Sequence, residues 1–214
     1  KHAAENLMEE LLSLIPNKDG RILDLGCGLG GTTEHLAKFF APERITAMPW
    51  DGRQQAGIAR LGVRVVTGRL PRADENAYDA VLNVESLSRP HRGSTWMRQL
   101  LRTLKPGGRF VGAEIISAAS STPWTRRRGL RLVRVHSTEA LQQLFEEVGF
   151  DEVKVVDVTA RTWAVFREKL ALFLWERASR NELDEDMMND LRYHLYGVFE
   201  PVTAYVVISA RKPV

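Results

Sequence analysis

Residues 21 to 37 read Arg-Ile-Leu-Asp-Leu-Gly-Cys-Gly-Leu-Gly-Gly-Thr-Thr-Glu-His-Leu-Ala. The apolar run from Ile22 to Leu25 is typical of a buried strand, and the glycine-rich turn after it leads into a helical pattern from Thr32 to Phe40. Glycines carry no side chain that would keep a ligand away from the backbone, and the N–H groups that begin a helix favour a polar or anionic ligand. The stretch therefore predicts a strand, a ligand-binding loop and a helix.

The loop satisfies G-x-G-x-x-G through Gly26, Gly28 and Gly31, a spacing that permits a dinucleotide fold. The fuller pattern D-L-G-C-G-x-G-G resembles the nucleoside loop of class I S-adenosylmethionine (SAM) dependent methyltransferases. The resemblance implies that five residues bind the cofactor SAM: Asp24, Gly26, Cys27, Gly28 and Gly30. The alternative is a tight turn that only packs a helix on a sheet, but three glycines exceed what such a turn needs.

Length and composition limit the class of protein. A chain of 214 residues with 44% hydrophobic content can bury one sizeable core, so we expect a single domain over 1–214. The net charge of +3 gives no sign of a nucleic-acid partner, and Cys27, the one cysteine, excludes an internal disulfide and a cysteine-based zinc site. The histidines show no metal-ligand spacing. With no apolar run long enough for a membrane span and no visible signal peptide, we expect a cytoplasmic protein, although a targeting sequence could precede Lys1.

Strand and helix patterns alternate along the chain. Strand patterns lie at 22–25, 44–48, 63–66, 78–83, 109–116, 153–158 and 205–212. Helical patterns lie at 3–15, 32–40, 54–61 and 95–104, and Ser137 is placed to cap a further helix that runs to Val148. Such alternation predicts an α/β fold in which a parallel sheet carries helices on both faces.

Two later segments are similar to the same methyltransferase pattern: Leu-Lys-Pro-Gly-Gly-Arg-Phe at 104–110 and Ala-Tyr-Asp-Ala-Val at 77–81. The resemblance covers roughly residues 5 to 212. It implies a three-layer, Rossmann-like methyltransferase fold, with a mostly parallel seven-stranded sheet and an antiparallel last strand. It also implies that the segment 117–136 is a lid over the acceptor substrate.

Ligands of such sheets bind outside the carboxyl ends of the strands. After the second strand, the resembling family has an acid that accepts hydrogen bonds from the ribose, whereas this chain has Pro49, which cannot accept through a side chain. The same alignment places Trp50 where an apolar residue packs on the adenine. Asp51 could compensate for the missing acid if the turn is shifted, or it could cap the following helix, which is the simpler alternative.

The third strand departs from the family in a second place. An acid normally reaches the adenine amino group here, but this chain has Arg69, which donates and cannot accept. Arg69 is therefore either a rearranged site residue or a solvated surface arginine. We include Leu70, beside it, and Asn83, which ends the fourth strand, among the predicted cofactor-binding residues. The loss of two recognition acids predicts SAM binding that is weak, rearranged or absent.

The segment after the fourth strand contains the candidate catalytic residues. Small-molecule methyltransferases that act on isoprenoid, sterol or polyketide-like skeletons have a similar segment with a glutamate at the place of Glu85. We predict that Glu85 faces a cationic donor or takes the proton of the acceptor, and that His91 serves as a second candidate base. The alternatives are a surface or helix-capping glutamate and a histidine in solvent.

Two later features bear on the substrate. The predicted lid holds five arginines that could clamp a carboxylate, a diphosphate or a carrier protein, or simply form a solvated face: Arg126, Arg127, Arg128, Arg131 and Arg134. Apolar residues recur at helical spacing from Trp163 to Leu174, followed by Met187 and Met188 on a second helix. We expect these helices to cover one end of the sheet, as core or as the wall of a lipophilic pocket.

These observations favour a SAM-dependent methyltransferase that acts on a lipophilic, natural-product-like small molecule by direct displacement at the methyl carbon. Pro49 and Arg69 motivate an alternative, in which the fold has lost ordinary SAM use and catalyses another reaction, such as a cyclisation. A third hypothesis is a non-catalytic partner or carrier-binding subunit, which only the arginine-rich lid supports.

Overall fold

The computed structural model describes the chain except for residues 1, 69, 71–73, 88–93, 118–136 and 193–201. The strands are β1 (Ile22–Leu25), β2 (Ile45–Met48), β3 (Arg64–Val65), β4 (Tyr78–Val84), β5 (Leu104–Ser117), β6 (Asp151–Asp157) and β7 (Val202–Arg211). The α-helices are α1 (His2–Ser13), α2 (Gly31–Leu36), α3 (Gln55–Ala59), α4 (Ser94–Thr103), α6 (Thr138–Val148), α7 (Trp163–Ser179) and α8 (Glu185–Arg192). Short 3-10 turns include η2 (Gly52–Gln54) and η4 (Thr159–Arg161).

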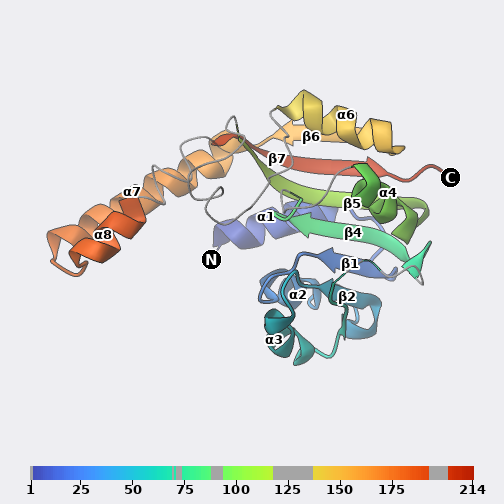
Figure 1. Ribbon diagram of the computed structural model, residues 1–214, viewed down its shortest axis with the longest axis horizontal. Coiled ribbons are helices and arrows are strands. Elements are labelled where there is room, and N and C mark those ends of the chain that lie inside the picture. Colours follow the sequence, from blue (N-terminus) through green and yellow to red (C-terminus); the bar gives the residue numbers. More distant parts are fainter. Residues whose placement is uncertain (1, 69, 71–73, 88–93, 118–136, 193–201) are drawn as a thin grey trace.

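The strands form one seven-stranded sheet in the order β3-β2-β1-β4-β5-β7-β6. The pairs from β3 to β5 are parallel, whereas β7 runs antiparallel to both β5 and β6. In Figure 1 the arrows of β1 and β4 point one way and the arrow of β7 points the other. The predicted methyltransferase-type sheet with its antiparallel last strand is therefore confirmed.

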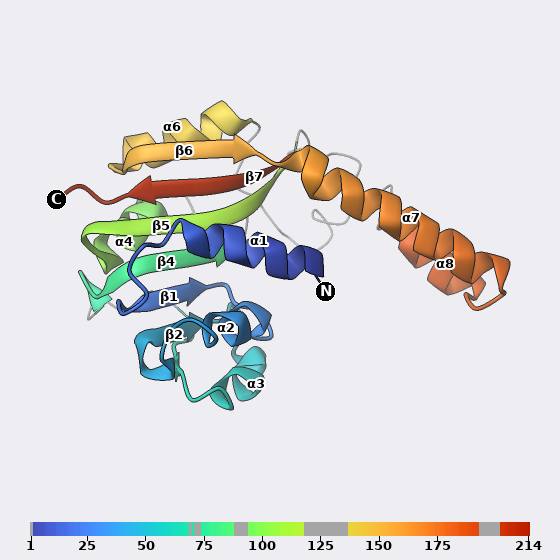
Figure 2. The same cartoon turned by 180° about the vertical axis from the view of Figure 1, so that it is seen from behind.

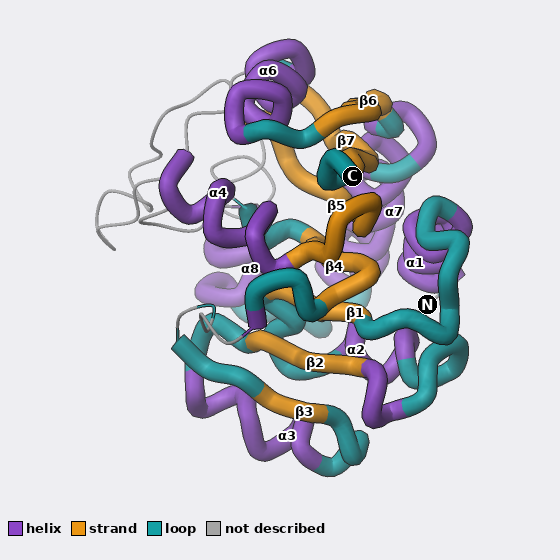
Figure 3. Tube along the Cα trace, turned by 90° about the vertical axis from the view of Figure 1, so that its right-hand side faces the viewer, coloured by secondary structure: helices purple, strands orange, loops and turns teal. Residues whose placement is uncertain are grey.

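Helices cover both faces of the sheet, as Figure 3 shows with α1 and α2 on one side and α4 and α6 on the other. Each face buries its own apolar cluster, since Leu11 and Leu36 pack on one side, and Leu100 and Phe145 on the other. The central strand β1 is buried along its whole length, which explains its unbroken apolar sequence. The two clusters hold the central strands, and therefore the loops that follow them, in a fixed arrangement.

Several boundaries follow local turn chemistry. The Ser137 hydroxyl accepts a hydrogen bond from Ala140 N and begins α6, and Gly149 ends that helix in the left-handed conformation, with φ of 109°. The strand predicted at 109–116 is longer in the structure, because Leu104 already pairs with Tyr78 before a shift in register. In the part of the chain that the structure describes, no helix is long and apolar enough to cross a membrane. The predicted lid lies almost wholly outside the described residues.

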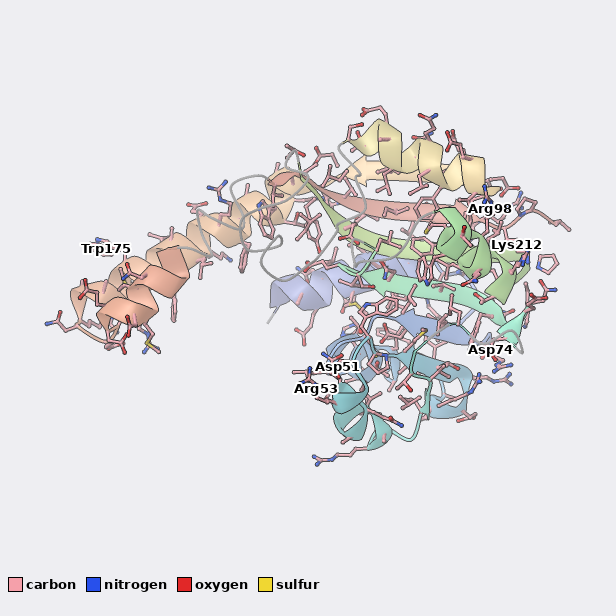
Figure 4. All side chains as sticks on the ribbon, viewed as in Figure 1. Asp51, Arg53, Asp74, Arg98, Trp175 and Lys212 are labelled. Carbon is pink, nitrogen blue, oxygen red and sulfur yellow. The ribbon has the colours of Figure 1, made fainter. Side chains whose placement is uncertain are left out.

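The expectation that the last helices cover one end of the sheet is wrong for much of their surface. Helices α7 and α8 project from the sheet in Figures 1 and 2, and α7 buries only Trp163 and Leu174 among its residues. Figure 4 places Trp175 far out on α7, where 71% of its surface is exposed, and Met187 is 53% exposed. Apolar side chains surround α7 instead of forming one stripe, so helical spacing did not identify a single packing face.

Candidate functional site

The parallel strands bring the predicted site residues to one edge of the sheet. Leu25, which ends β1, pairs with Met48 of β2 on one side and with Asn83 of β4 on the other. The segments that follow these strands, 26–30, 49–51 and 85–87, therefore lie side by side at the carboxyl edge. This is the position where open α/β sheets bind their ligands.

The glycine loop leaves its backbone open at one place. Gly26, Gly28 and Gly30 all have positive φ, at 76°, 56° and 97°, a conformation that strains other residues. A Cβ atom added at Gly28 would meet no atom of the described residues within 4 Å. At Gly26 it would clash with the Ser86 side chain and lie 2.5 Å from Trp50 Nε1. The space over Gly26 is thus filled by protein, and the open stretch of backbone is centred on Gly28.

Asp24 supports this loop from within the fold. The side chain is 1% exposed, and its Oδ2 accepts hydrogen bonds from the hydroxyls of Thr33 and Thr32, at 2.6 and 2.7 Å. Burial raises the pKa of Asp24 to about 6, against the effect of the two hydroxyl donors. Burial raises the pKa of the Cys27 thiol to about 12, and the charge of Asp24 acts in the same direction. This thiol therefore stays protonated and unreactive.

We expect the raised pKa of Asp24 to make the fold less stable as pH rises. Between about pH 4 and pH 6 the unfolded chain has lost this proton and the folded chain keeps it, so stability falls across that window, by up to about 3 kcal/mol in total. The Asp24→Asn variant lacks this titration and keeps an oxygen for the threonines. In urea unfolding from pH 4 to 8, wild type should lose free energy of unfolding relative to Asp24→Asn up to pH 6, then run parallel to it. Parallel curves throughout would contradict the assignment.

The segment after β2 directs its first carboxylate, that of Asp51, to a neighbouring residue of the same segment. Asp51 caps η2, where its carboxylate accepts from Arg53 N at 2.9 Å and pairs with the Arg53 guanidinium, with Nη2 at 2.5 Å from Oδ2. Figure 4 shows the two side chains together beside α3. The capping alternative therefore describes Asp51 in this structure. Trp50 lies over Gly26, with its ring 6.2 Å from that of Trp96 on α4.

The end of β4 is tied to β1 by side chains. Asn83 is fully buried, and its Nδ2 donates to Leu25 O at 3.0 Å and contacts Ser86 Oγ. The Ser86 hydroxyl also donates to Leu25 O, at 2.9 Å. Asn83 thus holds the end of β4 to the main chain at the end of β1. Leu70 is half-buried and packs against the apolar cluster on the α4 side of the sheet.

Glu85 is the first residue after β4 and has an unusual backbone, with φ of 50°. Its N–H donates to Ala113 O on β5 at 2.8 Å, and its exposed side chain accepts a 2.8 Å hydrogen bond at Oε1 from the Tyr205 hydroxyl on β7. A non-glycine residue in the left-handed region is strained and occurs often at functional sites. The structure therefore brings Glu85 to the same edge as the glycine loop.

Two residues of this edge were not identified from the sequence. Tyr205 contacts Glu85 from 120 positions away in the chain. Glu114 on β5 is buried, and its Oε2 accepts from Leu87 N at 2.7 Å, which holds the segment after Glu85. A single carboxylate inside the apolar run 110–116 was a signal for Glu114. Tyr205 had no local signal, because its strand reads as ordinary core.

The structure does not describe some of the predicted site residues. Arg69, His91 and the five lid arginines belong to segments that the structure does not describe. Within the described segments, no group of three or more histidine, cysteine, aspartate or glutamate side chains could hold a metal ion.

Comparison with known proteins identifies relatives of the whole fold. A family model described as "Methyltransferase domain" matches residues 1–155. The fatty-acid O-methyltransferase of Mycolicibacterium smegmatis is 31% identical over 196 residues, which cover 85% of this chain and 68% of that protein. Among solved structures, the [4+2]-cyclase SpnF is 26% identical with a TM-score of 0.71, and the match covers 100% of this chain and 83% of that one.

A further solved structure shares the fold at low sequence identity. Phosphoethanolamine N-methyltransferase 2 of Haemonchus contortus, in complex with S-adenosyl-L-methionine, has a TM-score of 0.74 at 17% identity. The likeness covers 98% of this chain but 53% of that chain, so the present chain spans about half of that protein's length.

Proposed function

Because the chain belongs to the class I SAM-dependent methyltransferases, we propose that it transfers a methyl group from SAM to a lipophilic small-molecule acceptor. The observation that carries this proposal is the open backbone at Gly28, at the carboxyl edge between β1 and its neighbours. A nucleoside needs a stretch of main chain without side chains, and a Cβ at Gly28 would point into the space that the nucleoside takes.

The cofactor would lie along the loop 26–30, with Trp50, Asp51, Arg69, Leu70 and Asn83 as its further surroundings. SAM, when bound, supplies an electrophilic methyl group on a sulfonium. The open backbone at Gly28 fits this group, and Trp50 lies at the same edge of the sheet. Pro49 offers no side-chain acceptor to the ribose, and Asp51 would have to leave Arg53 to take the place of the missing acid. We therefore expect binding in the micromolar range or weaker.

On the acceptor side, we assign proton removal to Glu85. Its carboxylate is exposed at the edge and held in place by Tyr205, so an acceptor hydroxyl can reach it. With SAM bound, the Glu85 carboxylate would take the hydroxyl proton while the acceptor oxygen receives the methyl group and S-adenosylhomocysteine is left. His91 stays a second candidate base. The remaining work of the protein is alignment and exclusion of water.

Relatives such as the fatty-acid O-methyltransferase support a lipophilic class of acceptor. We propose an acceptor with a long apolar body and one hydroxyl or carboxyl group. An anionic or carrier-bound form would suit the lid arginines 126–134, and this stays a prediction. So do the single-domain organisation of 1–214 and the cytoplasmic location.

The test is turnover with a small panel of acceptors. Purified protein is incubated with SAM and, in turn, dodecanoic acid, dodecanol and 4-octylphenol, and release of S-adenosylhomocysteine is measured with product identified by mass spectrometry. We expect a methylated product from at least one acceptor. Binding of SAM without methyl transfer to any acceptor of a widened panel would count against this function.

A second candidate function is a reaction other than methylation, such as a cyclisation. Two observations favour it: the 26% identity to the [4+2]-cyclase SpnF, and Pro49 in place of the ribose-binding acid. In that case a polyene substrate would disappear in the presence of the protein with no change in mass and no release of S-adenosylhomocysteine. Mass spectrometry of the same incubations separates the two functions.

A further inference from the structure

Main-chain hydrogen bonds and a ring contact hold Tyr205 in place. The residue is 4% exposed and sits on β7 opposite Ile115 of β5. Its N–H donates to Thr159 Oγ1 and its carbonyl accepts from Val158 N, both at 2.8 Å. The Trp163 ring, at the start of α7, stacks on the phenol ring with centroids 6.3 Å apart and planes 7° apart. The main chain of Tyr205 is therefore held by residues 158 and 159, and its ring packs against Trp163 of α7.

The hydroxyl of this fixed ring reaches the carboxylate of Glu85. The distance from Tyr205 OH to Glu85 Oε1 is 2.8 Å. The main chain of Glu85 is also fixed, since its N–H is bonded to Ala113 O and the segment two residues on is bonded to Glu114. A mobile surface glutamate would have neither restraint. The main chain of Glu85 and its carboxylate are thus each held by a hydrogen bond.

We propose that Tyr205 is a positioning residue for Glu85: its hydroxyl binds Oε1 and leaves Oε2 to take the proton of the acceptor. The inference rests on the proposed function, in which Glu85 removes that proton. In this proposal Tyr205 acts only through the carboxylate.

The chemistry of the phenol suits a permanent donor. Burial raises the pKa of Tyr205, and the negative charges of Glu85 and, more weakly, Glu114 act in the same direction. The phenol therefore keeps its proton throughout the pH range of enzyme assays. A hydroxyl that cannot ionise donates to the carboxylate at every working pH and does not compete with it as a base.

A double-mutant cycle tests the inference. We expect Tyr205→Phe to lower kcat about tenfold, Glu85→Gln to lower it about a hundredfold, and the double variant to be as slow as Glu85→Gln alone, because a positioning residue has no effect once its target is absent. The SAM dissociation constant and the KM of the acceptor should stay within twofold. A double variant slowed by the product of the two single effects would overturn the inference.

Tyr78→Phe is the matched control. Tyr78 is also buried, and its hydroxyl also donates to a carboxylate, Asp74 Oδ2 at 2.9 Å, but it begins β4 at the opposite edge of the sheet. Its loss should change stability without changing kcat. The deficit of Tyr205→Phe with 4-octylphenol should also shrink as pH rises toward 10, because the acceptor then loses its proton to solvent, and a purely structural defect would not respond in this way.

A spectroscopic measurement that needs no acceptor keeps the two proposals separate. In carbon NMR, the ring carbon that bears the hydroxyl reports the hydrogen bond of each of the four tyrosines. Glu85→Gln should shift the Tyr205 resonance, which its loss in Tyr205→Phe identifies, and should leave the Tyr78 resonance in place. If Glu85→Gln shifts the Tyr205 resonance but leaves turnover intact, the proton-removal role of Glu85 fails and the positioning role falls with it. If Glu85→Gln slows turnover but leaves this resonance unchanged, only the positioning role of Tyr205 is overturned.

Discussion

Replacing Gly28 with valine is expected to raise the dissociation constant of SAM at least a hundredfold. Among the described residues, nothing lies within 4 Å of a Cβ atom at Gly28, and the new side chain would occupy the proposed place of the nucleoside. A hundredfold change in affinity corresponds to about 2.7 kcal/mol, which is within reach of a direct steric block. Isothermal titration calorimetry with SAM measures the effect, and Gly28→Ala should give an intermediate value.

Gly62→Val is the control for this substitution. Gly62 also has positive φ, at 69°, and among the described residues a Cβ there would meet nothing closer than Pro42 Cβ at 4.0 Å. It precedes β3, at the opposite edge of the sheet, so the variant carries similar backbone strain away from the site. Both variants should lose similar stability, and only Gly28→Val should lose SAM. Equal losses of binding in the two variants would show that strain, not contact, explains the effect.

Glu85→Gln is expected to lower kcat for a hydroxyl acceptor about a hundredfold or more. Glutamine keeps the shape and can still accept from Tyr205, but it cannot take a proton, and general base catalysis contributes about 10²- to 10⁴-fold. SAM affinity should change less than twofold, because Glu85 is assigned to the acceptor. Release of S-adenosylhomocysteine under saturating SAM gives the rate.

Glu147→Gln is the matched control for that variant. Glu147 is an exposed glutamate on α6 that also accepts one side-chain hydrogen bond, from Gln143 Nε2 at 2.7 Å. Its loss should leave kcat unchanged. Turnover by Glu85→Gln at the rate of wild type would remove Glu85 from the mechanism and leave His91 as the remaining candidate base.

The sheet could be predicted from the sequence because its central strands are buried on both faces. Such strands read as short apolar runs, and here each run ends in a turn whose residues allow few alternatives, such as the glycines after Leu25. The cap at Ser137 was readable for the same reason, because it depends on one residue and its immediate neighbours. The antiparallel last strand came from the family resemblance.

The rest depends on contacts between distant residues. Helical spacing from Trp163 to Leu174 indicated a helix but not which surface, if any, would cover it, and much of α7 is exposed. The turn after Pro49 directs Asp51 to Arg53, which only the three-dimensional course of the chain decides. The hydrogen bond between Tyr205 and Glu85 joins β7 to the end of β4, and no sequence pattern near either residue predicts it.

The most direct measurement is a crystal structure of the protein with S-adenosylhomocysteine. We expect the nucleoside against the backbone at Gly28, at the carboxyl edge of β1, with the sulfur atom directed toward Glu85. Density for the ligand elsewhere on the protein, or an empty edge at millimolar ligand with Gly28 accessible in the lattice, would contradict it.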